Sequence, residues 1–598
     1  MTIFPKVKEM IKSSGHFSKP ISYRLPDELK PLDEILSVKF QKAQNNDVTL
    51  IFNHVSSYKE EEYRLSVTDS YITVSYSDYH GALYGIVTLI QLLEQGPLFL
   101  QDIHDYPDLK IRGVMIDISR DKIPTLSTLK QIVSHLMMLK INHLQLYVEG
   151  LAIEYPSFKD YQINETPFLL DEYEKLEAFA KTRGIDLVGN MNSFGHMTSW
   201  LAMEDFHELS ECPDGFVQWG FPFLASTLNP LDPKSLDFVK KLYQDFIPHT
   251  KSKYFNINCD EPFELGRGKS KEVCEKSSVE TVYLSFVKQL IGTVKEYQKQ
   301  PMMWGDVLIN HPKAADQLPK DTIFIDWGYD RSYDFSSHAS QLNSLGLPFI
   351  LAPGTSTWNS FTGRFQDMYL TTKNACISAK KYGGLGVITT DWGDNGHLQY
   401  FPWSYLGIAY LAQSSWCDDY DEFSSLHDFL NHFVFNDETN TLSQAMKELS
   451  SYNDSETHYV YNGTTLFQIL QYVDPTNRFP YELKKSTHAE MIKQNPLSLT
   501  SIQTLNRLIN GFHEAIQDLK ISSLLYNELI QTENFLRLGI LVNVYLNYPE
   551  SVDKQAIISL LDKLIDAHRK LWLARNKSGG LDRSLSRLIV LKEFIVSA

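Results

Sequence analysis

The chain has 598 residues, of which 43% are apolar, and this composition excludes a disordered chain, a collagen-like repeat and a small disulfide-stabilised domain. Acidic residues number 73 against 56 basic ones, and the formal charge of −17 disfavours nucleic acid as a partner because phosphates would be repelled. No apolar run reaches about 20 residues, so we expect no membrane span. The opening segment MTIFPKVKEMIKSSG lacks an apolar core and a small-residue cleavage site, so we expect a cytoplasmic protein.

The number and spacing of the cysteines are typical of a protein in a reducing compartment. There are five of them, an odd number, and they are scattered without a CxxC spacing: Cys212, Cys259, Cys274, Cys376 and Cys417. We therefore expect free thiols, and we predict neither a zinc site nor a thiol nucleophile.

Residues 1–108 are predicted to form a non-catalytic α/β domain. The segment 47–55 alternates polar and apolar residues like a strand, and 61–76 has the pattern of two strands joined by a short Asp-Ser turn. Apolar residues at helical spacing follow over 81–94. No pattern in this part suggests chemistry.

Residues 109–415 alternate short apolar runs with amphipathic helical stretches, exemplified by 126–139, 171–182, 237–247 and 280–297. A doubly wound open sheet shares this alternation, but eight units and the absence of a glycine-rich phosphate turn favour a (β/α)8 TIM barrel. The eight predicted strands are 111–117, 143–149, 185–191, 254–260, 301–307, 323–329, 348–354 and 385–391.

Residues 416–598 are predicted to form a C-terminal α-helical domain, because strand patterns stop and helical periodicity appears over 499–519, 522–545 and 554–572. The block 568–588 is dense in arginine and aromatic residues. Two interpretations stay open: a helix end with a Gly-Gly cap and a solvated face, or a segment that packs on the barrel near the site, in the same copy or from a second one.

Polar and aromatic residues gather where the predicted barrel strands end, and barrels of this kind carry their active sites at those ends. The hydrophobic core of a barrel requires apolar residues in the middle of each strand. It does not require acids, arginine and tryptophan at the ends of the strands, on one side of the barrel. Aromatic faces pack on the C–H faces of a pyranose ring, and carboxylates and arginine bind its hydroxyls. These candidates for sugar binding are Arg120, His196, Trp304, Trp327, Trp358, Trp392 and Asp394.

The dipeptide Asp260-Glu261 is the candidate catalytic pair. Asp-Glu occurs six times in the chain, but only this copy directly ends an alternating strand, FNINC. Adjacent residues point to opposite faces of a regular strand, so both reach one site only if the strand ends there and the backbone turns. That geometry poorly suits an acid and a nucleophile on either side of a glycosidic bond. It better suits two acids that serve the substrate's own nucleophile.

These residues resemble glycoside hydrolase family 20, the β-N-acetylhexosaminidases, over about residues 20–415. RGVMIDISR resembles the first barrel strand of the family, which ends in a substrate-binding arginine, here Arg120. NSFGHM resembles the family's Pro-Gly-His segment, and FNINCDE resembles its His-x-Gly-Gly-Asp-Glu strand. The departures are Phe194 for the proline, Asn256 for the histidine, and Asn258 and Cys259 for the two glycines. The family tyrosine that holds the acetamido oxygen has no clean counterpart. The helical C-terminus resembles a bacterial branch of the family.

The resemblance implies an exo-acting, retaining hydrolase of terminal N-acetylhexosamine on an oligosaccharide or glycoconjugate, with no metal or organic cofactor. Asp260 would orient the substrate's acetamido group and Glu261 would act as acid and then as base. GlcNAc and GalNAc stay open, as does a homodimer. Two alternatives remain: a related amino-sugar hydrolase with another linkage or endo action, and a non-catalytic carbohydrate-binding barrel, which only residues 256, 258 and 259 favour.

Overall fold

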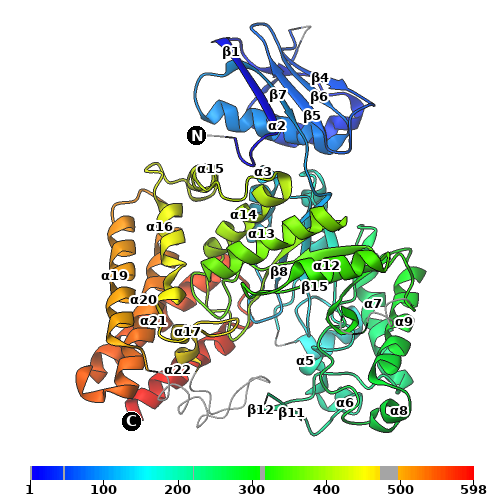
Figure 1. Cartoon of the computed structure of the whole chain (residues 1–598), viewed down its shortest axis with the longest axis vertical. Coiled ribbons are helices and arrows are strands. Elements are labelled where there is room, and N and C mark those ends of the chain that lie inside the picture. Colours follow the sequence, from blue (N-terminus) through cyan, green and yellow to red (C-terminus); the bar gives the residue numbers. More distant parts are fainter. Residues whose placement is uncertain are drawn as a thin grey trace.

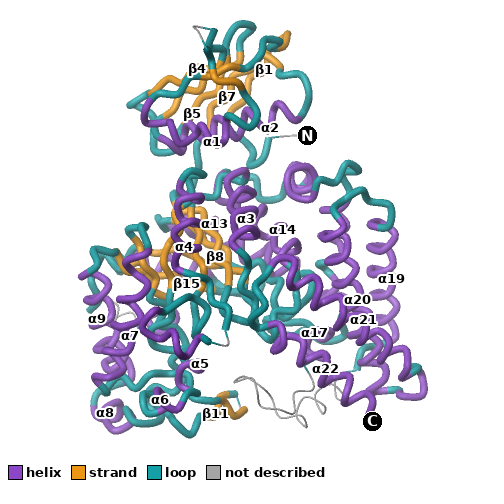
Figure 2. Tube along the Cα trace, turned by 180° about the vertical axis from the view of Figure 1, so that it is seen from behind, coloured by secondary structure: helices purple, strands orange, loops and turns teal. Residues whose placement is uncertain are grey.

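The computed structural model describes residues 3–44, 47–163, 165–219, 221–309, 311, 317–471 and 496–597. A sheet domain from the N-terminal part of the chain stands at one end of the molecule, above a barrel whose flank is covered by long C-terminal helices (Figures 1 and 2). Among the described residues, no helix combines the length and the hydropathy that crossing a membrane would need.

The N-terminal domain is a seven-stranded mixed sheet in the order β1-β7-β5-β6-β4-β2-β3. Helix α2 (Tyr79–Glu94) packs on it with most of its side chains buried, and its first turn is capped by the Asp78 carboxylate, which accepts from the Gly81 amide. Strand β1 was not predicted because all of its residues are exposed, so its sequence shows no alternation. The strands are β1 Glu9–His16, β2 Ser22–Tyr23, β3 Gln41–Lys42, β4 Leu50–His54, β5 Tyr63–Val67, β6 Ile72–Tyr76 and β7 Phe99–Asp105.

The central domain is a closed barrel of eight parallel strands in the order β10-β13-β14-β15-β16-β17-β8-β9, which confirms the predicted (β/α)8 architecture. Every residue of β8 is buried, as expected where helices cover the outside of a parallel sheet. The barrel strands are β8 Ile111–Asp117, β9 His143–Tyr147, β10 Asp186–Asn190, β13 Tyr254–Asn256, β14 Gln300–Trp304, β15 Ile323–Trp327, β16 Phe349–Ala352 and β17 Gly386–Asp391.

Helices alternate with these strands around the barrel, and a small β-hairpin is inserted between two of the units. The outer helices include α3 Leu126–Met138, α4 Leu170–Lys181, α7 Pro233–Phe246, α9 Val279–Glu296, α12 Phe335–Ser344, α13 Phe365–Tyr382 and α14 Tyr405–Trp416. Between β10 and α7 the chain forms short helices, α5 (Thr198–Leu201) and α6 (Glu204–His207), and the hairpin of β11 (Phe216–Gln218) and β12 (Phe221–Phe223). This insertion stands at the barrel mouth (Figure 1).

The part that follows β17 is helical in the residues that the structure describes. Its longer helices are α16 Leu442–Leu449, α19 Leu499–Ile516, α20 Ser523–Asn547, α21 Lys554–Arg575 and α22 Leu581–Ser597. Trp403, just after the barrel, donates its indole N–H to Thr532 in α20 at 3.0 Å, so the helices are bonded to the barrel as well as packed on it.

Block 568–588 has a solvated outer side, where Arg569 and Lys570 are 50% and 78% exposed, and an inner side that packs on the barrel. His568 and Trp572 are fully buried and Arg587 is almost so. At Gly580, with φ of +78°, a Cβ would lie 2.1 Å from the Asp121 carbonyl oxygen, so only glycine allows this approach to the barrel. Arg583 continues the contact through an ion pair of 2.8 Å with Asp121. The block therefore packs on the barrel of its own copy, where the ring of Trp572 lies 5.4 Å from the Lys122 ammonium and His568 lies 2.9 Å from the Tyr400 hydroxyl.

Candidate active site

All nine predicted site residues line one cavity of about 720 Å³ at the carboxyl ends of the barrel strands, which we call the catalytic pocket. They come from seven different strand ends, so closure of the barrel brings them together. Its lining includes Arg120, His196, Asp260, Glu261, Trp304, Trp327, Trp358, Trp392 and Asp394.

The Asp260-Glu261 pair lies where the backbone leaves β13. The strand ends at Asn256, four residues earlier than the predicted end, because Asn258, Cys259 and Glu261 adopt φ of +57°, +68° and +47°. Asn258 and Cys259, which stand at the two glycine positions of the family motif, therefore have a left-handed backbone conformation although both carry side chains. This turned exit breaks the alternation of the strand, and both acids consequently reach the same pocket.

Neighbouring segments hold the turned exit in place. The Tyr283 hydroxyl donates to the Cys259 carbonyl at 2.9 Å, and the Glu261 amide donates to the Asp306 carboxyl at 3.2 Å. Gly195, in the predicted NSFGHM motif, lies so close that a Cβ would be 2.3 Å from the Asp260 carbonyl oxygen. Asp260 is buried, and its Oδ1 has no hydrogen-bond partner among the described residues, so this oxygen is available to a ligand.

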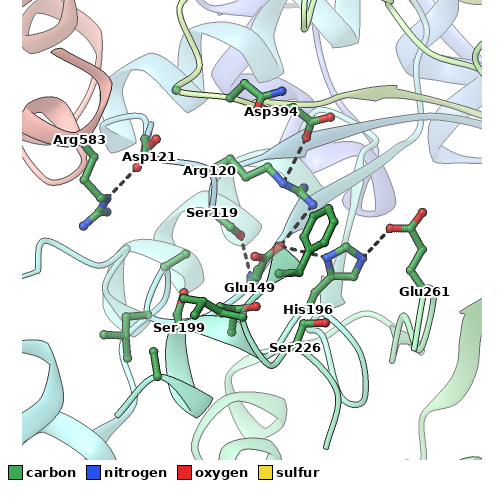
Figure 3. Close-up of a pocket in the computed structure, with 18 of the residues that line it drawn as sticks. Ser119, Arg120, Asp121, Glu149, His196, Ser199, Ser226, Glu261, Asp394 and Arg583 are labelled. Atoms are coloured by element: carbon green, nitrogen blue, oxygen red, sulfur yellow. Dashed lines mark hydrogen bonds and ion pairs between the residues drawn. The ribbon is translucent and has the colours of Figure 1, made fainter. Parts of the chain in front are cut away.

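One wall of the pocket is a chain of ion pairs, drawn in Figure 3. Arg120 pairs with Glu149 at 3.4 Å and with Asp394 at 3.2 Å. His196 lies 3.3 Å from Asp260, 3.4 Å from Glu261 and 3.8 Å from Glu149. We call Arg120, Glu149, His196 and Asp394 the charged wall. It fixes a cation and carboxylates at set positions, as recognition of hydroxyl groups requires.

Asp117, at the end of β8, orients the charged wall. Its carboxylate accepts from the amide of Arg120 at 3.2 Å, from the guanidinium of Arg120 at 3.0 Å and from the amide of Gly393 at 3.0 Å. It thus positions Arg120 and, through Gly393, the loop that carries Trp392 and Asp394. Burial opposes the charge of Arg120, but the carboxylates of Glu149 and Asp117 raise its pKa above the ordinary value. Burial also raises the pKa of Asp394, to about 6, against the pull of Arg120.

The opposite wall is aromatic. Trp304, Trp327, Trp358 and Trp392 line it, and Trp304 and Trp392 meet with ring centroids 6.1 Å apart. The buried indole N–H groups of Trp304, Trp327 and Trp358 have no hydrogen-bond partner among the described residues. Buried polar groups are nearly always paired, so these three donors indicate a polar ligand in the pocket.

Three functional candidates in the structure escaped the sequence prediction. Glu149 follows β9 by two residues and was not among the predicted site residues. Tyr329 is buried between Trp327 and Trp358, with centroids 5.3 and 5.0 Å away, and its only sequence signal is a position two residues after Trp327. Asp306 lies behind the catalytic pair, where burial and the charges of Asp260 and Glu261 raise its pKa to about 8.

A barrel whose strand ends place two adjacent acids in a pocket walled by tryptophans and ion-paired carboxylates defines a glycoside hydrolase. The chain belongs to glycosyl hydrolase family 20: the model of the family's catalytic domain matches residues 110–382, and that of its domain 2 matches residues 3–115. It is a glycoside hydrolase of the β-N-acetylhexosaminidase type.

Individual relatives agree with this assignment. Beta-hexosaminidase subunit alpha of Rattus norvegicus is 22% identical over 379 residues, which are 58% of this chain and 67% of that protein. The chitobiase of Flavobacterium johnsoniae superposes with a TM-score of 0.60 at 18% identity and covers 99% of this chain and 98% of its own. An exo β-N-acetylglucosaminidase of Vibrio harveyi gives 0.59 at 17% identity, with 71% and 76% covered. The two structures share the fold of this chain.

Proposed function

We propose that the protein removes terminal non-reducing β-linked N-acetylglucosamine, or N-acetylgalactosamine, by exo-acting, retaining, substrate-assisted hydrolysis. The observation that carries this proposal is the turned exit of β13, which aims two adjacent acids into one pocket at the barrel mouth. Two acids in sequence, on one side of the pocket, are poorly placed to flank a glycosidic bond. They are well placed to serve a nucleophile that the substrate carries itself.

The reaction follows from the positions of these acids. The acetamido oxygen of the substrate forms a bond to the anomeric carbon while the bond from that carbon to the leaving oxygen breaks. Glu261 donates its proton to the leaving oxygen, and Asp260 orients the acetamido N–H and balances the positive charge of the oxazolinium ion. Glu261 then takes a proton from a water molecule that attacks the anomeric carbon from the vacated side. The acetamido group is restored, and two inversions retain the configuration.

The rest of the pocket supports this assignment. With the anomeric carbon at Asp260 and Glu261, the ring lies between the tryptophans and its far hydroxyls meet Arg120 and Asp394. Tyr329, buried against Trp327 and Trp358, is the tyrosine that the pocket offers to the acetamido oxygen. It stands on the β15 side of the barrel and supplies the phenol that the strand patterns did not reveal.

The test is the release of 4-nitrophenol from 4-nitrophenyl β-N-acetylglucosaminide by the wild type and by Asp260→Asn. We expect kcat to fall by about 10³-fold or more, because a preorganised charge is removed from the developing oxazolinium. Asp421→Asn is a matched control: it belongs to another Asp-Glu dipeptide, and its side chain is 73% exposed in an ion pair with Lys373. Near-normal turnover in Asp260→Asn, or a comparable loss in Asp421→Asn, would contradict the mechanism.

A further inference from the structure

Buried amide side chains form a network inside the barrel, next to the turned exit of β13. Its members are Gln145 in β9, Asn190 at the end of β10, Asn256 at the end of β13 and Asn258 in the exit, and we call them the amide network. None of these four residues is more than 1% exposed. Apolar residues usually fill the interior of such a barrel, so four amides at this place indicate a specific role.

Hydrogen bonds join the four amides across three neighbouring strands. The Gln145 Oε1 accepts from the side chain of Asn190 at 2.8 Å and from that of Asn256 at 3.0 Å. Asn258 donates from its side chain to the Asn190 Oδ1 at 2.7 Å, and from its backbone amide to the Asn256 Oδ1 at 2.9 Å. Two separate routes therefore lead from the exit of β13 to Gln145, and they tie this exit to β9 and β10.

The amide network carries no charge. Gln145 also donates to the Nε2 of His143 at 3.0 Å, and burial lowers the pKa of this histidine to about 3, so its ring is neutral as well. A charge in the barrel interior would act strongly on the nearby catalytic acids, because the interior has a low dielectric constant. Amides can fix the geometry of the exit without placing such a charge beside Asp260 and Glu261.

Asn258 is the residue at which the amide network meets the turned exit. Its φ of +57° lies in the left-handed region, which is unfavourable for a residue with a side chain unless other contacts hold it there. The bonds to Asn190 and Asn256 hold Asn258 through its side chain and its backbone at once. Its carbonyl oxygen accepts from the amide of Trp304 at 3.1 Å, so the same residue also ties the exit to the aromatic wall.

The conformation of Asn258 determines the direction of the Asp260 side chain. Only Cys259 separates the two residues, and a return of Asn258 to an extended conformation would restore the alternation of the strand. The carboxylate of Asp260 lies 3.3 Å from His196, while its Oδ1 bonds to none of the described residues. Its direction therefore depends mainly on the backbone that the amide network holds.

We propose that Asn258 and Asn190 are positioning residues for the reaction, because their bond holds the turned exit of β13 in the conformation that presents Asp260 to the acetamido group of the substrate. The inference rests on the proposed function, which assigns that group to Asp260. It also gives a role to the departures from the family motif at residues 256 and 258. A bonded asparagine at 258 replaces the conformational freedom of glycine, so these departures no longer favour a non-catalytic barrel.

The first variant is Asn258→Gly, because glycine adopts the left-handed conformation without strain but cannot bond to Asn190. We expect kcat on 4-nitrophenyl β-N-acetylglucosaminide to fall by about 10- to 100-fold, as small misplacements of a reacting group do. KM should stay within threefold, since Arg120 and Asp394 are unchanged. A purely structural role would lower the unfolding free energy and leave kcat as it is. A kcat within twofold of the wild type would overturn the proposal.

A second variant tests the bond from its other end. Asn190→Ala removes the acceptor of the Asn258 side chain, and kcat of the double variant should lie within threefold of the slower single variant, because one bond is lost only once. Losses that multiply would overturn the proposal. Asn431→Ala is the matched control: this fully buried amide accepts from Ser443 at 2.7 Å and donates to Asn440 at 3.0 Å, in the helical C-terminal part. It should lower the unfolding free energy and leave kcat within twofold.

Binding of a thiazoline analogue of the oxazolinium ion gives a readout that needs no turnover. The wild type should bind it more tightly than N-acetylglucosamine, because it resembles the species that forms during the reaction. Calorimetry on Asn258→Gly should show at least a tenfold loss of affinity for the thiazoline and less than a threefold loss for N-acetylglucosamine. Equal losses for the two ligands would overturn the proposal. If the folded wild type neither cleaves the substrate nor binds the thiazoline, the proposed function fails first, and this inference fails with it.

Discussion

The two walls of the catalytic pocket are built in opposite ways. Over β14 to β17 the wall is aromatic, and the indole N–H groups of Trp304, Trp327 and Trp358 have no hydrogen-bond partner in the part of the chain that the structure describes. Over β8 to β10 the wall is charged, and its groups hold one another through Asp117, Arg120, Glu149 and His196. The aromatic wall is held by packing and leaves donors available, whereas the charged wall is held by ion pairs and by the packing of Arg120 on the rings of Tyr147 and Trp392. Losing one member should therefore damage the charged wall much more than the aromatic one.

The largest expected effect is at Arg120. Arg120→Met leaves the carboxylates of Asp117, Glu149 and Asp394 without their shared cation. Removing one partner of a buried charge pair from a binding site costs about 2–5 kcal/mol of binding free energy, so we expect kcat/KM on 4-nitrophenyl β-N-acetylglucosaminide to fall by about 10³-fold. Arg120→Lys should recover little of the loss, because an ammonium group cannot reproduce the fork of a guanidinium. Full recovery by lysine would show that only the charge matters.

The pH dependence tests Asp306, behind the catalytic pair. Its pKa of about 8 exceeds the ordinary 3.8, so the folded protein keeps a proton that the unfolded chain loses between these values. The unfolding free energy should therefore fall as pH rises from about 4 to about 8. Chemical denaturation at several pH values would measure this slope. Asp306→Asn should flatten it, and the alkaline decline of kcat near pH 8 should weaken in the same variant. If the unfolding free energy depended on pH with the same slope in the wild type and in Asp306→Asn, the buried proton would not belong to Asp306.

A smaller effect is expected on the aromatic wall. Trp358→Phe keeps a ring but removes an indole N–H that bonds to none of the described residues, and a neutral hydrogen bond contributes about 0.5–1.5 kcal/mol. We expect kcat/KM to fall by up to about tenfold. Trp403→Phe is the control, since its indole N–H already bonds to Thr532 outside the pocket. That variant should lower the unfolding free energy and spare kcat/KM. Equal kinetic losses in the two variants would mean that the donor of Trp358 does not meet the substrate.

The last expected effect is on stability and concerns the backbone that joins the two walls. Cys259 is buried with φ of +68°, a region that disfavours side chains and above all β-branched ones. Cys259→Val should lower the unfolding free energy by about 2 kcal/mol, whereas Cys259→Gly should stay within about 1 kcal/mol of the wild type, because relief of strain offsets lost packing. Urea unfolding measures both. Similar values for valine and glycine would show that the exit of β13 is not strained.

The sequence revealed those parts of the site that follow from local pattern. Trp304, Trp327 and Asp260 could be placed because each follows a short apolar run and barrel strands end at one mouth. The contact between α22 and the barrel could not be predicted. It depends on Arg583 meeting Asp121, an ion pair that no local periodicity encodes. Strand β1 was missed for a related reason, since an exposed strand shows no alternation of burial.

The contact between α22 and the barrel also sets an order of events during synthesis. Arg583 and Asp121 are separated by 462 positions, so the barrel strands and their catalytic acids leave the ribosome long before the helix that closes the mouth. Until α22 docks, the barrel presents an open mouth, with the cavity wall near Asp121 uncovered. At about 5–20 residues per second, the stretch between the two residues takes on the order of a minute or less to synthesise. A nascent barrel therefore has its catalytic acids before it has its complete binding surface, and selectivity for the glycan is the last property to form.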